Sequence, residues 1–167
     1  MFPESLTVQA AALIDLCRSK GLLLATAESC TGGLIAGLVT SIAGSSDIFD
    51  AGFVTYSNAA KTRMIGVPAK LIARVGAVSE EVARAMAEGA LAHSRAALAV
   101  AVTGVAGPGG GSALKPVGLV HCAAARLNHG PVHRELRLGG IGRTEVRLAT
   151  VAAAIAMAYE MAALAPP

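Results

Sequence analysis

Aromatic residues are scarce in this sequence. They make up 3% of its 167 residues, and tryptophan is absent. Charged residues reach only 15%, whereas 54% of the residues are hydrophobic. A buried core must therefore be aliphatic, built from Ala, Val, Leu and Ile. The length fits one domain with a sizeable core, and no repeat or linker divides residues 1–167.

Cysteine is also rare. Cys17, Cys30 and Cys122 are widely spaced and odd in number, so they form neither a metal-ligand pair nor a disulfide framework. No other ligand cluster predicts a metal or cofactor. The first residues lack the basic start and apolar run of a secretory signal. These features favour a reducing cytoplasm.

No apolar run is long enough to predict a membrane span. The longest, residues 148–164, is rich in alanine and interrupted by Glu160, whereas a span needs about 20 strongly apolar residues. We expect a buried helix or one at a subunit interface, because a helix that is apolar all round must be covered. This helix therefore predicts a homodimer or a higher homo-oligomer.

Positive charge gathers in the second half of the chain. The net charge is +3, but residues 115–147 hold six basic residues and two glutamates, a net +4. No aromatic residues are interleaved there and no nucleic-acid motif is present, so we do not expect a nucleic-acid partner. A phosphorylated small molecule is the partner that this charge favours.

Apolar runs and turn signals divide the chain into alternating elements. Helical spacing or composition predicts helices at 5–20, 31–42 and about 144–163, with shorter helices between them. Strands are predicted at 22–26, 51–56, 97–102, 117–124 and 132–138. The wholly apolar 97–102 is typical of a central strand, and the alternating 132–138 of a strand near an edge. The expected fold is a three-layer α/β/α domain with a mixed, largely parallel sheet.

Three loops follow strand ends, at residues 27–33, 57–61 and 103–112. In open α/β sheets, ligands bind beyond the carboxyl ends of the strands. If these strands are parallel, the three loops converge on one crevice. The glycine-rich loop 103–112 would let a ligand approach the backbone closely, although a flexible connection has the same composition.

Ser29 lies in the first of these loops, between a strand and a helix. Backbone N–H groups and the positive helix end suit an anion or an oxyanion at such a point. The alternative is that Ser29, Thr31 or both merely cap the helix. Glu28 has three possible roles: orienting Lys61, binding a substrate amide, or pairing with an arginine.

Lys61 is the candidate base for Ser29. No His–Asp pair is suggested, whereas a lysine desolvated in the crevice would lose its proton more easily. Tyr56 could hydrogen-bond either group. The alternative is a surface lysine and a core tyrosine with an exposed hydroxyl.

Four motifs resemble those of the CinA C-terminal domain family. They are residues 26–33 (TAESCTGG), 55–61 (TYSNAAK), 103–110 with 115–118 (TGVAGPGG and KPVG), and the pair Arg143 and Arg147. The resemblance extends from about residue 6 to residue 163. The closing motif departs from the family pattern, since Gly-Ile-Gly at 140–142 replaces an aromatic residue, glycine and aspartate.

The resemblance implies a nicotinamide-nucleotide amidase, which converts nicotinamide mononucleotide, a phosphorylated pyridine nucleoside, to nicotinate mononucleotide and ammonia. It implies Ser29 as nucleophile, Lys61 as base and Tyr56 as an assisting residue. The residues expected to bind substrate are Glu28, Thr31, Gly32, Gly33, Thr103, Gly104, Gly107 and Arg143. A stand-alone form is expected at this length. The alternatives are an amidase for another carboxamide and a non-catalytic nucleotide-binding module linked to competence or DNA damage.

Overall fold

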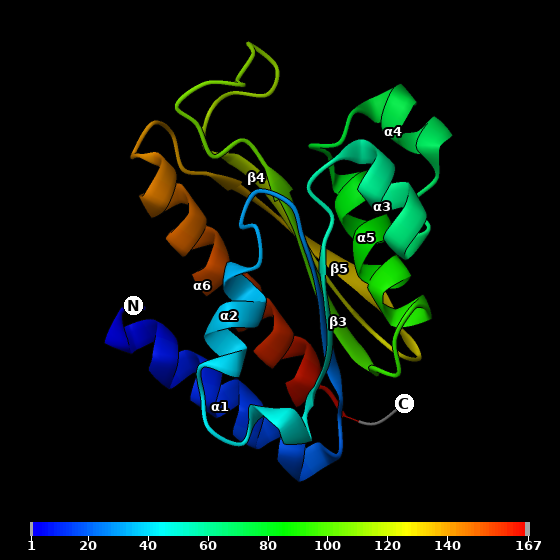
Figure 1. Cartoon of the computed structure of the whole chain (residues 1–167), viewed down its shortest axis with the longest axis vertical. Coiled ribbons are helices and arrows are strands. Elements are labelled where there is room, and N and C mark those ends of the chain that lie inside the picture. The colour runs from blue at the N-terminus through cyan, green and yellow to red at the C-terminus, as the bar shows by residue number, and fades with distance from the viewer. Residues whose placement is uncertain (1, 166–167) are drawn as a thin grey trace.

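A five-stranded sheet lies between two layers of helices in the computed structural model, which describes residues 2–165 (Figure 1). The elements follow in the order α1 (Glu4–Lys20), β1 (Leu24–Glu28), α2 (Leu34–Thr40), η1 (Ser45–Asp47), β2 (Phe49–Val54), α3 (Asn58–Ile65), α4 (Ala69–Val75), α5 (Glu80–Ala92), β3 (Leu98–Gly104), β4 (Leu119–Arg126), β5 (His129–Arg137) and α6 (Arg143–Ala163). The predicted three-layer α/β/α architecture is confirmed.

The strand order in the sheet is β2-β1-β3-β4-β5. β1 pairs in parallel with both β2 and β3, whereas β4 pairs antiparallel with β3 and with β5. Four strands therefore run in one direction and only β4 opposes them, which agrees with a mixed, largely parallel sheet. As predicted, β3 lies at the centre and β5 at an edge.

The two faces of the sheet carry side chains of different size. Leu98, Val100 and Val102 of β3 join the core beneath α1, α2 and α6. Ala99 and Ala101 alternate with them and join the core beneath α5 and its neighbours α3 and α4. The small alanines leave room for a helix to lie close to the sheet on that side. Figure 1 shows the two groups of helices on opposite sides of the strands.

Helix α6 is long and apolar enough to cross a membrane by length and composition alone, but 50% of its most apolar stretch is buried inside the domain. It packs against α1, β3 and β4. The buried Arg126 donates hydrogen bonds to the carbonyl of Met161, at 3.0 Å, and to that of Leu164 just beyond the helix end, at 2.8 Å. These contacts are those of a core helix. The predicted oligomer stays a prediction.

Two element boundaries near the Ser29 turn differ from those predicted. The helix expected from residue 31 begins at Leu34, because Gly32 and Gly33 have φ angles of 61° and 99° and form a left-handed turn. The loop expected from Thr103 begins later, because Thr103 and Gly104 still pair with β4. The turn after β1 is therefore longer, and the glycine-rich loop shorter, than the sequence pattern indicates.

Candidate active site

Ser29 lies just beyond β1, at the carboxyl edge of the three parallel strands. Its N–H donates to the carbonyl of Val102 at 3.1 Å, so the backbone is still bound to β3 at this residue. The carbonyl of Ser29 then accepts from Gly32 N–H at 3.0 Å, which closes a tight turn. The sheet therefore fixes the Ser29 backbone on one side and the turn fixes it on the other.

Lys61 contacts Ser29 directly. Its Nζ lies 3.0 Å from Ser29 Oγ and 2.8 Å from the carbonyl oxygen of Thr55. Helix α3 carries Lys61 to this position, and the helix starts immediately after Ser57, whose side chain accepts from Ala60 N–H. The pairing predicted for these two residues is present in the structure.

Burial favours the uncharged form of Lys61. The side chain is 1% exposed, and desolvation lowers the pKa of its amine below the ordinary value of 10.5. A neutral amine can donate one N–H to the carbonyl of Thr55 and direct its lone pair at the Ser29 hydroxyl. The sulfur of Cys30 is the weaker opposing influence on this pKa.

A pocket of about 290 Å³ opens beside Ser29. It is lined by Ser29, Cys30, Tyr56, Val78, Arg143 and by residues 104–107, 109 and 110 of the glycine-rich loop. All three predicted loop regions thus meet near Ser29, with Tyr56 just before the second and Lys61 buried behind the serine. Ordinary small-molecule sites are about this size or larger.

Arg143 joins two walls of the pocket. One of its terminal nitrogens donates to the carbonyl of Gly107 at 2.6 Å, and the other lies 3.2 Å from Tyr56 Oη. The hydroxyl of Tyr56 makes no hydrogen bond with Ser29 or Lys61, and the residue is 61% exposed. The expectation that Tyr56 would bond to one of these two residues is therefore wrong. It stands at the exposed rim with its hydroxyl toward Arg143.

Cys30 lines the same pocket but is a poor nucleophile. Burial raises the pKa of its thiol to about 11, so the thiol stays protonated at neutral pH. Among the described residues, no histidine lines the pocket. His121 and His133 instead contact each other, with 2.9 Å between Nδ1 and Nε2. The lysine-paired serine is therefore the nucleophile that this pocket offers.

Glu28 does not line the pocket, contrary to the expectation that it binds substrate. Its carboxylate is 1% exposed and accepts four hydrogen bonds from the turn and from the start of α2. The donors are Thr31 Oγ1 at 2.6 Å, Gly33 N and Ile35 N at 3.0 Å, and Ala36 N at 2.8 Å. Glu28 thus fills the anion-binding end of α2, and neither Ser29 nor Thr31 caps the helix.

Four more residues predicted to bind substrate lie outside the pocket. Thr31 and Thr103 are buried, and their hydroxyls donate to Glu28 and to the carbonyl of Ala77. Gly32 and Gly33 provide the left-handed turn. These residues shape the site from behind, whereas Gly104, Gly107 and Arg143 line it as predicted.

Arg147 is a site residue whose part the sequence does not indicate. It comes one helical turn after Arg143 on α6 and donates to two successive carbonyls of the Ser29 turn. Nε lies 3.2 Å from the carbonyl oxygen of Cys30, and Nη2 lies 2.9 Å from that of Thr31. The second arginine of the closing motif was the only signal that could have pointed to it.

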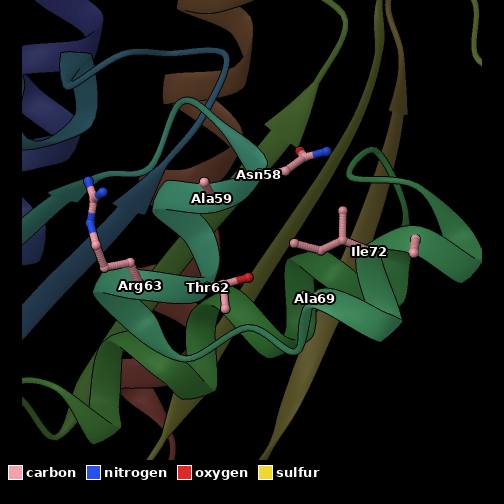
Figure 2. A pocket seen from close by; sticks show the side chains of 7 residues that line it. Asn58, Ala59, Thr62, Arg63, Ala69 and Ile72 are labelled. Atoms are coloured by element: carbon pink, nitrogen blue, oxygen red, sulfur yellow. The ribbon is translucent and has the colours of Figure 1, made fainter.

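A larger hollow of about 450 Å³ lies elsewhere, between α3 and α4 (Figure 2). Asn58, Thr62 and Arg63 of α3 face it together with Ile72 of α4. It contains neither a nucleophile paired with a base nor, within residues 2–165, a cluster of three metal-ligating side chains. The chemistry of the chain is therefore concentrated in the smaller pocket at the strand ends.

The fold and the site together define a class of protein: an α/β domain with a lysine-paired serine at the carboxyl edge of its parallel strands. The chain belongs to the CinA C-terminal domain family, which matches residues 6–162. That span agrees closely with the one expected from the four motifs.

Similar proteins include the CinA-like proteins of Geobacter sulfurreducens, 60% identical over 114 residues, and of Akkermansia muciniphila, 48% identical over 145 residues. These matches cover 68% and 87% of this chain but only 28% and 34% of the relatives. The chain thus spans about a third, or less, of the length of these relatives.

Solved structures match over nearly the whole chain. Competence/damage inducible protein CihA from Agrobacterium tumefaciens has a TM-score of 0.92 and 56% identity, covering 94% of this chain and 95% of that one. Competence damage-inducible protein A from Klebsiella pneumoniae has a TM-score of 0.88 and 33% identity, covering 93% and 95%.

Proposed function

We propose that this domain is an amidohydrolase that converts nicotinamide mononucleotide to nicotinate mononucleotide and ammonia through an acyl-enzyme on Ser29. The observation that carries the reaction type is the 3.0 Å contact between Lys61 Nζ and Ser29 Oγ inside a buried environment. The substrate follows from the family resemblance of the four motifs. The pocket volume and the guanidinium of Arg143 suit a small phosphorylated ligand.

The reaction begins with a proton transfer. Neutral Lys61 takes the proton of Ser29 Oγ while Oγ forms a bond to the carboxamide carbon, and the carbonyl electron pair moves onto oxygen. Backbone N–H groups of the Ser29 turn stabilise that oxyanion, a contribution of about 3–4 kcal/mol per donor. The N–H groups that begin α2 take no part, because Glu28 already accepts from three of them.

Collapse of the intermediate breaks the C–N bond. The proton held by Lys61 passes to the leaving nitrogen, so ammonia departs and Lys61 is neutral again. Water then attacks the ester carbon with Lys61 once more as base, and the proton returns to Ser29 as the carboxylate product leaves. One lysine is therefore both base and acid in each half of the reaction.

The rest of the nucleotide extends along the pocket. Arg143 offers charge, and the glycine-rich loop offers backbone N–H groups to the ribose phosphate. Because the hydroxyl of Tyr56 is held near Arg143, the tyrosine ring stands at the rim, where it can contact the pyridine or ribose. No metal or cofactor is required by this scheme.

Ammonia release from nicotinamide mononucleotide by the purified chain tests the proposal. Ser29→Ala and Lys61→Ala should each reduce turnover by at least about 10³-fold, since each removes one member of a nucleophile–base pair. Lys70→Ala, at an exposed lysine of α4, is the matched control and should keep the wild-type rate. Undiminished turnover in either site variant would exclude the dyad.

Two alternatives remain. The names of the solved relatives refer to competence and damage, which keeps a non-catalytic nucleotide-binding module as the second candidate. That module predicts nucleotide binding without ammonia release and with full tolerance of Lys61→Ala. An amidase for another carboxamide would instead show turnover on a panel of amides that lack the phosphate.

A further inference from the structure

The contacts of Arg147 differ from those of Arg143, the arginine that lines the pocket. The guanidinium of Arg147 donates to two successive carbonyls, those of Cys30 and Thr31, directly after the serine. Within residues 2–165 it forms no ion pair with a carboxylate. It does not line the pocket, whereas Arg143 does. The hydrogen bonds of Arg147 are therefore made to the backbone of the turn that carries Ser29.

Because peptide groups are planar, the contacts of Arg147 with backbone carbonyls also fix the direction of neighbouring N–H groups. The C=O of one residue and the N–H of the next point to opposite sides of a planar trans peptide. When Arg147 holds the carbonyl of Thr31, it directs Gly32 N–H to the other side, toward the carbonyl of Ser29. The carbonyl of Ser29 is held by Gly32 N–H in the same way, and this bond directs the N–H of Cys30.

Of the N–H groups of Cys30 and Thr31, only that of Cys30 belongs to a residue that lines the pocket, because Thr31 is fully buried and lies outside it. Within the described part of the chain, no other residue accepts a hydrogen bond from Cys30 N–H or Thr31 N–H. Cys30 lines the pocket and directly follows the serine. In serine hydrolases with a comparable strand–turn–helix nucleophile, the N–H after the serine is an oxyanion donor.

The charge of Arg147 adds to the orientation. A cation bound to a carbonyl polarises the peptide and strengthens the N–H on its far side as a donor. Helix α6, which carries Arg147, packs beside α2 (Figure 1), so the guanidinium is anchored by a rigid element rather than by a loop. Glu28 and Arg147 therefore bind complementary backbone groups around the same turn. The carboxylate of Glu28 accepts hydrogen bonds from N–H groups, and the guanidinium of Arg147 donates hydrogen bonds to carbonyls.

We propose that Arg147 is a positioning residue that fixes the turn after Ser29 through the carbonyls of Cys30 and Thr31, so that the N–H group of Cys30 forms the oxyanion site next to Ser29. This inference rests on the proposed function, because it assigns a role within the acyl transfer. A guanidinium suits the task because its fixed fork reaches two acceptors at once, which a lysine ammonium cannot reproduce in the same geometry.

The test compares Arg147→Gln and Arg147→Lys with the wild type in steady-state ammonia release. Loss of one oxyanion donor typically lowers kcat by 10²–10³-fold. We expect Arg147→Gln, in which the Cys30 N–H is misdirected but present, to lower kcat by roughly 10–100-fold with KM changed less than about twofold. Arg147→Lys should recover part of that loss. Arg134→Gln is the matched control, because Arg134 also contacts α6, through Glu160, but away from the pocket.

A second readout separates positioning from loss of fold. The rate at which a fluorophosphonate labels Ser29 also depends on oxyanion donors, so Arg147→Gln should slow labelling by a similar factor while its far-UV circular dichroism stays native. If Arg147→Gln does not fold, Arg147→Lys decides: a lowered kcat at unchanged KM supports the proposal. A wild-type kcat in either folded variant, or a loss confined to KM, overturns it.

Failure of the proposed function gives a different result. If the wild type releases no ammonia from nicotinamide mononucleotide, the amidase assignment falls, and the labelling rates alone decide the role of Arg147. If the wild type is not labelled at Ser29 either, both proposals fall. If the wild type is active and Arg147→Gln keeps its kcat, only the role of Arg147 is refuted.

Discussion

Replacing Glu28 with glutamine should destabilise the domain strongly while leaving the shape of the side chain almost unchanged. Glu28 Oε2 accepts from Thr31 Oγ1, Gly33 N and Ile35 N, and Oε1 accepts from Ala36 N. A glutamine can place its oxygen at only one of these positions. Its NH₂ group then faces a donor, and at least one buried N–H loses its partner.

The magnitude follows from those four bonds. An orphaned buried N–H costs about 1–3 kcal/mol, and three bonds that change from charged to neutral acceptors lose about 0.5–1 kcal/mol each. The neutral amide regains part of the cost of burying a charge, which offsets some of this loss. The expected net effect is about 3 kcal/mol, a large share of the roughly 5–15 kcal/mol that stabilises a domain.

Urea unfolding followed by circular dichroism measures the change. With a slope of about 2 kcal/mol per molar urea, the midpoint should fall by about 1.5 M. Glu160→Gln is the control: that carboxylate is 59% exposed and, among residues 2–165, pairs only with Arg134, so its loss should stay below about 1 kcal/mol. A midpoint for Glu28→Gln within 0.3 M of the wild type, at about that slope, would refute the structural role of Glu28. A raised KM with unchanged stability would restore substrate contact as its role.

Further predictions concern Lys61 and two helix glycines, Gly89 of α5 and Gly37 of α2. If the neutral amine of Lys61 is the base, as proposed, kcat/KM should rise with pH through an ionisation below 10.5, because burial lowers the pKa of this amine. A pH–rate profile measures that rise. At pH values between the lowered pKa of Lys61 and its ordinary pKa, the unfolded chain binds one more proton than the folded domain, so the free energy of unfolding should rise with pH there. Lys61→Met should abolish that rise and increase the free energy of unfolding at neutral pH by about 0.5–2 kcal/mol, measured by urea unfolding. Gly89→Ala should lower the free energy of unfolding by about 1–3 kcal/mol in thermal unfolding, because the new Cβ would overlap the carbonyl oxygen of Ile65. Gly37→Ala should instead stabilise α2 by up to about 1 kcal/mol, because its Cβ would meet only a ring carbon of Phe2, at 3.9 Å.

The layers, the central strand and the convergence of the loops could be predicted because they depend on local signals. A strand as apolar as 97–102 is stable only when helices cover both faces of the sheet at that strand. Parallel strands bring their carboxyl ends to the same edge of the sheet. The pairing of Ser29 and Lys61 follows from that edge, since each residue comes shortly after a strand end. Thirty-two positions separate them in the chain, yet the sheet topology brings them together.

The parts of the site that could not be predicted depend on which backbone groups form hydrogen bonds with a buried side chain. Glu28 is conspicuous in the sequence as a carboxylate at the end of a buried strand. Its four donors lie three to eight residues further on, in the turn and at the start of α2, and the left-handed shape of that turn cannot be predicted from composition. Arg147 reaches carbonyls 116 and 117 residues earlier, and a backbone acceptor leaves no trace in the sequence. The carbonyl of Thr55, which holds Lys61, was missed for the same reason.

The occupied end of α2 decides where an anionic substrate can bind. A helix that begins beside a nucleophile is an attractive site for any anion, including the phosphate of the substrate, and a phosphate held there would compete with the reacting amide. Glu28 prevents this, because its own carboxylate takes the three N–H groups that begin α2. The donor of this turn that remains beside the pocket is then the N–H group of Cys30, which suits one oxyanion rather than a whole phosphate. Under the proposed function, we therefore expect the substrate phosphate on the other side of the pocket, near Arg143 and the glycine-rich loop, with the amide carbon directed at Ser29.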